Sequence, residues 1–387
     1  MTTAEYQRGG VEAPGDSTST PPRFSYAGLW SASAVSRTSA WLLGSVAWHW
    51  DGSAWQAVTL PPNTTLGAVA EVAPDDAWAV GSRLSDRSPL VAHWDGVRWS
   101  VVALPAGIPG FSRALMTSVS AAGSRDVWAL GENFHPWWPR LFHWNGHEWL
   151  RQPAPAPPGR GKAGYTKVVA DGPSSVWLVT ALGDIIRHWD GSQWQTVPPP
   201  FGERDPIRDF SATGWNNAWA VGSYRAGDRE HGWSSRPLAA HWDGSAWTIT
   251  RVPDLPGHND AELRSVVAVG RNDAWAMGPS DHLALGDTLA AWTSQRVLLV
   301  HWDGRRWSVT RGSGLAKLKY PAVIAAAPDG TAWVAGNCGN DSFVLGWNGV
   351  SWKVVPHPRD LRWNPFLTTA SERRQRLVSC ASAASGG

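Results

Sequence analysis

The strongest constraint on the fold of this 387-residue chain is a motif that recurs seven times. Five copies read His-Trp-Asp-Gly-x-x-Trp, the third has Asn145 for aspartate, and the seventh has Gly346 and Asn348 for histidine and aspartate. A second element, Trp-x-x-Gly, precedes every copy, with Thr180 in the glycine position of the fourth. The first motif tryptophans lie at positions 50, 94, 144, 189, 242, 302 and 347. The chain therefore consists of related units that must bury their apolar faces against one another.

Each unit divides into four strand-like segments, and unit lengths of this size are typical of the blades of a β-propeller. We predict an all-β fold: a seven-bladed β-propeller of four-stranded antiparallel blades in residues 23–358. The blades are expected at about residues 24–60, 65–104, 111–153, 164–198, 207–253, 261–311 and 318–358. Each unit supplies a whole blade, so we expect no strand exchange in closing the ring. Residues 1–22 are expected to form a disordered tail, and residues 359–387 a mostly disordered one.

The Asp-Gly pair of the motif predicts a tight hairpin between the third and fourth strands of each blade. A type I′ turn needs positive φ at both central residues, which suits Asp or Asn followed by Gly. That two-residue turn pairs Trp48 with Trp55 across the hairpin. It also places both motif tryptophans on one face of the blade and the histidine on the other.

In a four-stranded antiparallel meander, the first and third connections lie at one end of the blade. The short, uniform turns therefore gather at one end of the ring. The second-to-third connections and the links between blades, which vary in length, gather at the other end. Because binding residues are often carried by variable loops on a rigid scaffold, we expect the ligand at this second end.

The repeat resembles the β-propeller superfamily, and it looks like the Trp-rich His-Trp-Asp-Gly-x-x-Trp propellers common in actinobacterial genomes. The Trp94-Asp95 pair is similar to the WD40 dipeptide, although no Gly-His opens the repeat and the kelch Gly-Gly doublet is missing. Asp-box propellers have a comparable hairpin with one more residue between aspartate and tryptophan. The resemblance covers about residues 24–358 and implies the fold, and we transfer no catalytic residue from it.

The tryptophans and histidines of the repeat are expected to be structural. The tryptophans would pack between blades, because exposing so many would promote aggregation. The histidines at positions 49, 93, 143, 188, 241 and 301 lie too far apart to bind one metal ion, and we expect buried, hydrogen-bonded, neutral rings. Stability should then fall below about pH 6.

Composition excludes several functional classes. Charged residues make up 17% of the chain, the net charge is +2, and no basic stripe predicts nucleic-acid binding. No apolar run is long enough to span a membrane. Cys338 and Cys380 are too few for a cysteine metal site, and we expect no cofactor and no metal. The first twenty residues contain no signal-like apolar segment, so we expect a cytoplasmic protein. We also expect it to be a monomer.

Candidate ligand-binding residues are the aromatic and polar side chains in or near the variable connections. They are His135, Trp137, Trp138, Arg140, Tyr224, Arg225, Glu230, His231, Trp233, His258, Asp281, His282 and Trp292. Indole rings there suit stacking on a sugar or anchoring a partner protein, although packing within the loops is equally compatible.

Two functions remain open from the sequence. The first is a non-enzymatic binding or scaffolding module that recognises a protein or a carbohydrate through the variable-loop end. The alternative is a lyase or glycoside hydrolase with its site at the mouth of the central channel. It would combine one of His135, His231, His258 and His282 with Glu230, Asp281 or Tyr224. The sequence has no nucleophile elbow or phosphate-binding loop.

Overall fold

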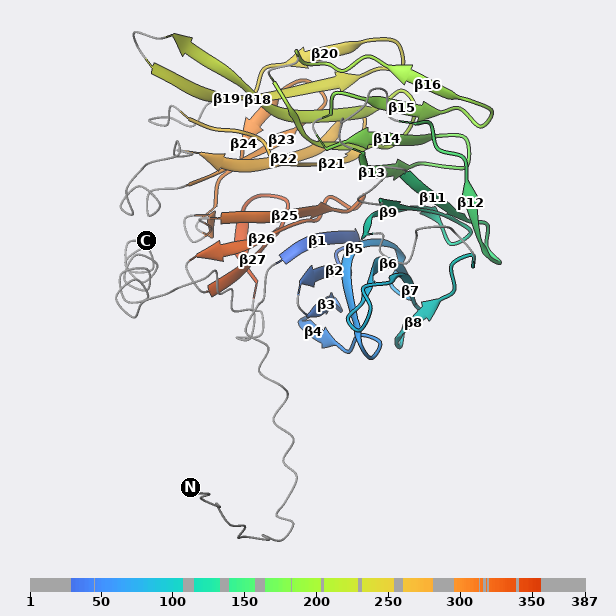
Figure 1. Cartoon of the computed structure of the whole chain (residues 1–387). Helices are drawn as coiled ribbons and strands as arrows, with labels where there is room; N and C mark the ends of the chain where they lie inside the picture. The colour runs from blue at the N-terminus through green and yellow to red at the C-terminus, as the bar shows by residue number, and fades with distance from the viewer. Residues whose placement is uncertain are drawn as a thin grey trace, which may run out of the picture.

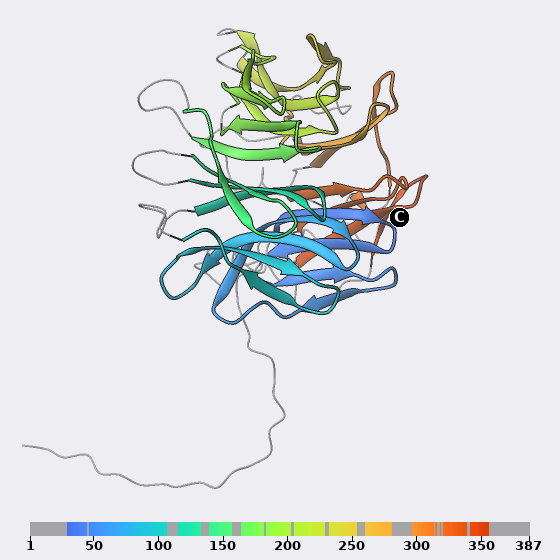
Figure 2. The same cartoon turned by 90° about the vertical axis from the view of Figure 1, so that its right-hand side faces the viewer.

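The computed structural model describes residues 29–355, without residues 45, 107–114, 133–138, 157–163, 182, 203–204, 229–231, 254–259, 281–295, 313, 316–317, 319 and 339–340. The described residues form seven separate antiparallel sheets, each of four strands that follow one another in the chain. Figures 1 and 2 show these sheets fanned side by side as blades. The seven-bladed propeller predicted from the repeat is confirmed.

The strands of the seven blades have the following bounds. Blade 1 contains β1 (Leu29–Ser36), β2 (Ser39–Gly44), β3 (Ala47–Trp50) and β4 (Trp55–Val58). Blade 2 contains β5 (Thr64–Ala73), β6 (Asp76–Arg83), β7 (Pro89–Trp94) and β8 (Trp99–Val102). Blade 3 contains β9 (Leu115–Gly123), β10 (Asp126–Glu132), β11 (Pro139–Trp144) and β12 (Trp149–Gln152). Blade 4 contains β13 (Tyr165–Ala170), β14 (Val176–Thr180), β15 (Ile186–Trp189) and β16 (Trp194–Val197). Blade 5 contains β17 (Ile207–Ala212), β18 (Ala218–Asp228), β19 (Gly232–Trp242) and β20 (Trp247–Thr250). Blade 6 contains β21 (Ser265–Gly270), β22 (Asp273–Ser280), β23 (Arg296–Trp302) and β24 (Trp307–Val309). Blade 7 contains β25 (Tyr320–Ala326), β26 (Ala332–Cys338), β27 (Asp341–Trp347) and β28 (Trp352–Val354).

The first and last blades pack against each other, and the described residues include no strand shared between them. The first strand of each blade contacts the first strands of its two neighbours, and β25 contacts β1 in the same way (Figure 1). The backbone N–H of Arg37 in blade 1 also donates to Asp329 Oδ2 of blade 7 at 2.7 Å. Among the described residues, no sheet contains strands from both ends of the ring.

Serine side chains link the inner strands of neighbouring blades. Ser31 Oγ and Ser33 Oγ of β1 accept hydrogen bonds from the backbone N–H groups of Val69 and Glu71 on β5, at 3.1 and 2.9 Å. Ser118 and Ser120 join β9 to β13 in the same way, and Asp209 and Ser211 do so between β17 and β21. These side chains satisfy edge N–H groups that no neighbouring strand pairs, which explains the small polar residues there.

The predicted hairpin turn is wrong in detail. Trp50 pairs directly with Trp55, and Trp48 pairs with Ala57, so four residues form the turn. Gly52 has φ of 93°, whereas Asp51 is not in the positive-φ region. The Asp51 carboxylate instead accepts hydrogen bonds from the backbone N–H groups of Ser53 and Ala54, at 2.8 and 2.9 Å. All seven turns share this carboxylate or amide contact, so Asp or Asn is needed as an acceptor.

The tryptophans form the contacts between blades. Trp41 of β2 packs edge-on against Trp94 and Trp99 of the next blade, with ring centroids 5.0 Å apart in both pairs. Equivalent trios recur where blades 2 and 3, 5 and 6, 6 and 7, and 7 and 1 meet. Every one of the seven buried apolar clusters spans two neighbouring blades. The predicted packing role of the repeat tryptophans is confirmed.

Each motif histidine lies against the second-strand tryptophan of its own blade. The six pairs of ring centroids are 4.1 to 4.7 Å apart. Each histidine Nε2 also lies within hydrogen-bond distance of the residue two positions before that tryptophan: Ser39, Asp76, Asp126, Ser175, Asn217 or Asp273. Burial lowers the pKa of His49 and His241 below the usual value and that of His188 to about 4. These three rings are therefore neutral near pH 7. The predicted burial holds for His188, whereas the other five motif histidines are partly exposed.

Candidate functional site

Blade 5 differs from the other blades in the length of its central hairpin. β18 and β19 pair without interruption from Ala218 opposite Trp242 to Asp228 opposite Gly232. β17 pairs with β18 only as far as Gly222, and β20 pairs with β19 only as far as Ala239. The outer half of the hairpin therefore projects beyond the four-stranded sheet at the variable-loop end (Figure 1).

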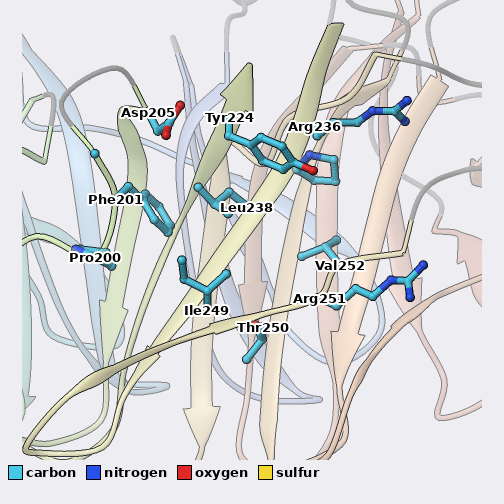
Figure 3. A pocket seen from close by; sticks show the side chains of 12 residues that line it. Pro200, Phe201, Asp205, Tyr224, Arg236, Leu238, Ile249, Thr250, Arg251 and Val252 are labelled. Atoms are coloured by element: carbon cyan, nitrogen blue, oxygen red, sulfur yellow. The ribbon is translucent and has the colours of Figure 1, made fainter. Parts of the chain in front are cut away.

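A groove lies on blade 5 where this projection begins. Its volume is about 540 Å³, and it opens to solvent. It is lined by the link between β16 and β17, by β18 and β19, and by β20 with the residues that follow it (Figure 3). The lining residues are Pro200, Phe201, Gly202, Asp205, Tyr224, Arg236, Pro237, Leu238, Ile249, Thr250, Arg251 and Val252.

The strand registers explain why apolar side chains meet in this groove. Tyr224 pairs with Arg236 across the hairpin, and Ala240 pairs with Ile249, so Tyr224, Arg236, Leu238 and Ile249 all lie on the face of blade 5 toward blade 4. Leu238 belongs to the core between blades 4 and 5, together with Phe201. Tyr224 is 42% exposed and Ile249 is 60% exposed, so the groove presents apolar surface to solvent.

Three charged side chains surround the apolar part of the groove. Figure 3 shows Asp205 on one side, beside Phe201, and Arg236 and Arg251 on the other side. Arg225 follows Tyr224 on β18, with an exposed side chain. Among the described lining residues, two guanidinium groups stand against one carboxylate.

The structure describes four of the predicted site residues. Tyr224 lines the groove, and Arg225 is its neighbour on β18. Arg140 lies on β11 of blade 3, outside the groove, where burial and the nearby Arg151 lower its pKa. The backbone of Trp233 pairs with Gly227. All four lie on strands, which corrects their predicted placement in loops, because these hairpins pair further than the repeat indicates.

The other predicted site residues lie outside the described residues. They are His135, Trp137, Trp138, Glu230, His231, His258, Asp281, His282 and Trp292. The channel-mouth enzyme site depends on these residues, apart from Tyr224. Within the described part of the chain, no group of three or more His, Cys, Asp or Glu side chains is arranged to hold a metal ion. No helix among the described residues has the length and apolar character needed to cross a membrane.

Most residues of the groove carry no signal in the sequence that marks them as a site. Phe201, Leu238 and Ile249 are apolar residues next to repeat motifs, where they look like ordinary core positions. Arg236 lies within β19, and Arg251 directly follows β20. One signal was available: 53 residues separate the motif tryptophans at 189 and 242, against 44 or 45 between several other pairs. The added residues lengthen β18 and β19.

The seven sheets and their closed order make this chain a seven-bladed β-propeller with a groove on its fifth blade. Three solved structures share the fold. YCF48 from Cyanidioschyzon merolae is 14% identical, with 81% of this chain and 94% of that chain covered and a TM-score of 0.51. A GH74 xyloglucanase from Xanthomonas campestris is 14% identical, with 83% of this chain but only 52% of that chain covered and a TM-score of 0.55. The β-propeller domain of the Trilobed protease from Pyrococcus furiosus, described as having an open velcro topology, is 9% identical, with 85% and 97% covered and a TM-score of 0.52.

At such low identities, the likeness to these structures establishes the fold alone. No protein-family model matches the sequence, and no curated protein sequence matches it either.

Proposed function

We propose that this protein is a non-enzymatic binding module that holds a partner protein at the variable-loop end of the propeller. The observation that supports this function is the groove on blade 5, where exposed Tyr224 and Ile249 flank buried Phe201 and Leu238. Exposed apolar surface inside a concavity is typical of sites that lose water on binding. Aromatic and arginine side chains such as those of this groove are the types that most often dominate the binding energy of protein interfaces.

The groove favours a protein over a carbohydrate, the other ligand class expected from the sequence. Leu238 and Ile249 offer aliphatic surface, and burying sugar hydroxyls against such surface without hydrogen bonds costs free energy. An apolar side chain of a protein meets no such cost.

The test compares three forms of the protein on glycan and peptide arrays. The double variant Tyr224→Ala/Ile249→Ser removes the exposed apolar surface of the groove. The matched control Val97→Ser changes a side chain that is 81% exposed in a short turn at the opposite end of the propeller. We expect wild type and Val97→Ser to bind the same peptides and the double variant to lose them. Unchanged binding by the double variant, or binding of glycans alone, would contradict the proposed function.

A further inference from the structure

The groove on blade 5 has an apolar floor of limited size. Phe201 and Leu238 are 8% and 9% exposed and form its buried part, whereas Ile249 remains 60% exposed at its edge. Figure 3 shows Phe201, Leu238 and Ile249 close together, with Tyr224 above them. A floor made of a few side chains fits one or two apolar side chains of a ligand.

The charges beside this floor select the chemistry of the ligand. Arg236 and Arg251 lie on the same side of the groove (Figure 3). Guanidinium groups bind carboxylates with paired hydrogen bonds, and they lose less hydration on binding than ammonium groups do. Asp205, on the other side, would repel a carboxylate placed there and attract a cation or a backbone N–H group.

We propose that the groove binds an extended acidic segment of a partner protein, with an apolar side chain on the floor and a carboxylate against Arg236 and Arg251. This inference rests on the function proposed above and specifies the ligand of the same site. The charge complementarity between the two arginines and the acidic segment orients the segment along the groove, because Asp205 disfavours the opposite orientation.

The edge of β19 indicates that the segment is held by its side chains. Pro237 follows Arg236 at the point where pairing with β20 has ended, and proline has no backbone N–H to donate. Further along β19, the backbone N–H and C=O groups of Ser235 are already paired with Asp260 and Ala261. The usual backbone ladder of an added strand is therefore blocked at two adjacent outward positions of this edge.

The experiment measures binding of short fluorescent peptides by fluorescence anisotropy. The peptides have a central leucine or serine, one flank of glutamines, and another flank of glutamates, glutamines or lysines. We expect wild type to prefer the peptide with leucine and glutamates, by at least about tenfold over its serine or lysine counterpart. Binding should weaken with added salt, since exposed charges are screened.

Two charge variants test the role of the arginines. Arg251→Glu, at an exposed position, should weaken binding of the acidic peptide at least about tenfold and improve binding of the lysine peptide. Arg236→Gln keeps a polar side chain. It should weaken binding of the acidic peptide without improving binding of the lysine peptide. Circular dichroism melting confirms that both variants fold, and Val97→Ser serves again as the control.

The results separate the ligand chemistry from the proposed function. If peptides bind through Tyr224 and Ile249 but Arg251→Glu keeps the acidic preference, the proposed ligand is wrong and the binding module stands. If wild type binds none of these peptides, or binds only acidic oligosaccharides on a glycan array, the acidic-segment proposal is overturned.

Discussion

Trp333 of the last blade packs against Trp50 of the first blade, with ring centroids 5.0 Å apart and ring planes inclined by 55°. Trp333 also contacts Trp55 at 5.6 Å, so one indole completes the same trio that Trp41 forms with the next blade. Because the described strands include none shared between blades 7 and 1, indole packing of this kind contributes to the closure of the ring.

Removing this indole should destabilise the protein strongly. Trp333 is 5% exposed, and truncating a buried tryptophan to alanine costs about 3–5 kcal/mol in the free energy of unfolding. The control is Trp30→Ala, because Trp30 is 46% exposed and donates one hydrogen bond to the carbonyl of Leu66. That variant should lose about 1 kcal/mol. Urea unfolding, monitored by tryptophan fluorescence, measures the free energy of unfolding of both variants. An equal loss of stability in the two variants would argue against a role of Trp333 in closing the ring.

The glycine of the hairpin turn should be required for its backbone conformation. Gly349 has φ of 92° and no atom within 4 Å of a Cβ placed on it, so Gly349→Ala tests conformation without a steric clash. We expect a loss of about 1–2 kcal/mol in the free energy of unfolding. Gly123→Ala is the matched control, because that site is equally open but lacks positive φ. Thermal unfolding should leave Gly123→Ala near wild type, and a comparable loss in both variants would refute the argument.

His188 should make the protein less stable in mild acid. Burial lowers its pKa from 6.5 to about 4, so the unfolded chain binds a proton between these values that the folded protein does not. The free energy of unfolding should therefore fall as the pH drops from 6.5 to 4, by about 1–3 kcal/mol from this residue. His188→Gln should flatten this part of the profile. Identical profiles for wild type and His188→Gln over this range would contradict the prediction, whereas the wild-type profile alone also contains the opposite contribution of Glu71.

Glu71 should make the protein less stable as the pH rises, in contrast to His188. Burial raises its pKa from 4.5 to about 7, and Ser39 donates a hydrogen bond to it. The folded state holds the proton between these values, so the stability contributed by the neutral carboxyl group declines as the pH rises from 4.5 through 7. Glu71→Gln should be more stable than wild type at pH 8 by about 1–2 kcal/mol and should have no advantage at pH 4.5. Denaturant unfolding at both pH values measures this, and an equal difference at both would exclude ionisation as the cause.

The sequence predicted the blades well because the constraint on them is periodic. Tryptophans equivalent to Trp50 and Trp55 occur in all seven repeats and mark one hairpin per blade. Each hairpin must bury its indoles against a neighbouring blade. The turn was predicted wrongly because Asp-Gly suits two geometries. Asp51 can adopt a positive φ or accept hydrogen bonds from Ser53 and Ala54, and spacing alone does not distinguish these roles.

The groove could not be predicted from the motifs because its residues are apolar and distant in sequence. Phe201 lies in a link between blades, Leu238 on β19 and Ile249 on β20, and only the strand registers bring them onto one face. Tyr224 was selected as a polar loop residue, and it reaches the groove because β18 extends further than the other second strands.

The serine contacts between inner strands have a consequence for the packing of neighbouring blades. Ser33 Oγ is committed to the N–H of Glu71, as Ser31 Oγ is to that of Val69, so these hydroxyls already have a partner. A change that removed either hydroxyl would leave the N–H group of Val69 or Glu71 without this acceptor, which costs free energy. Substitutions of Ser31 or Ser33 by alanine should therefore loosen the contact between the first two blades on the inner side of the ring.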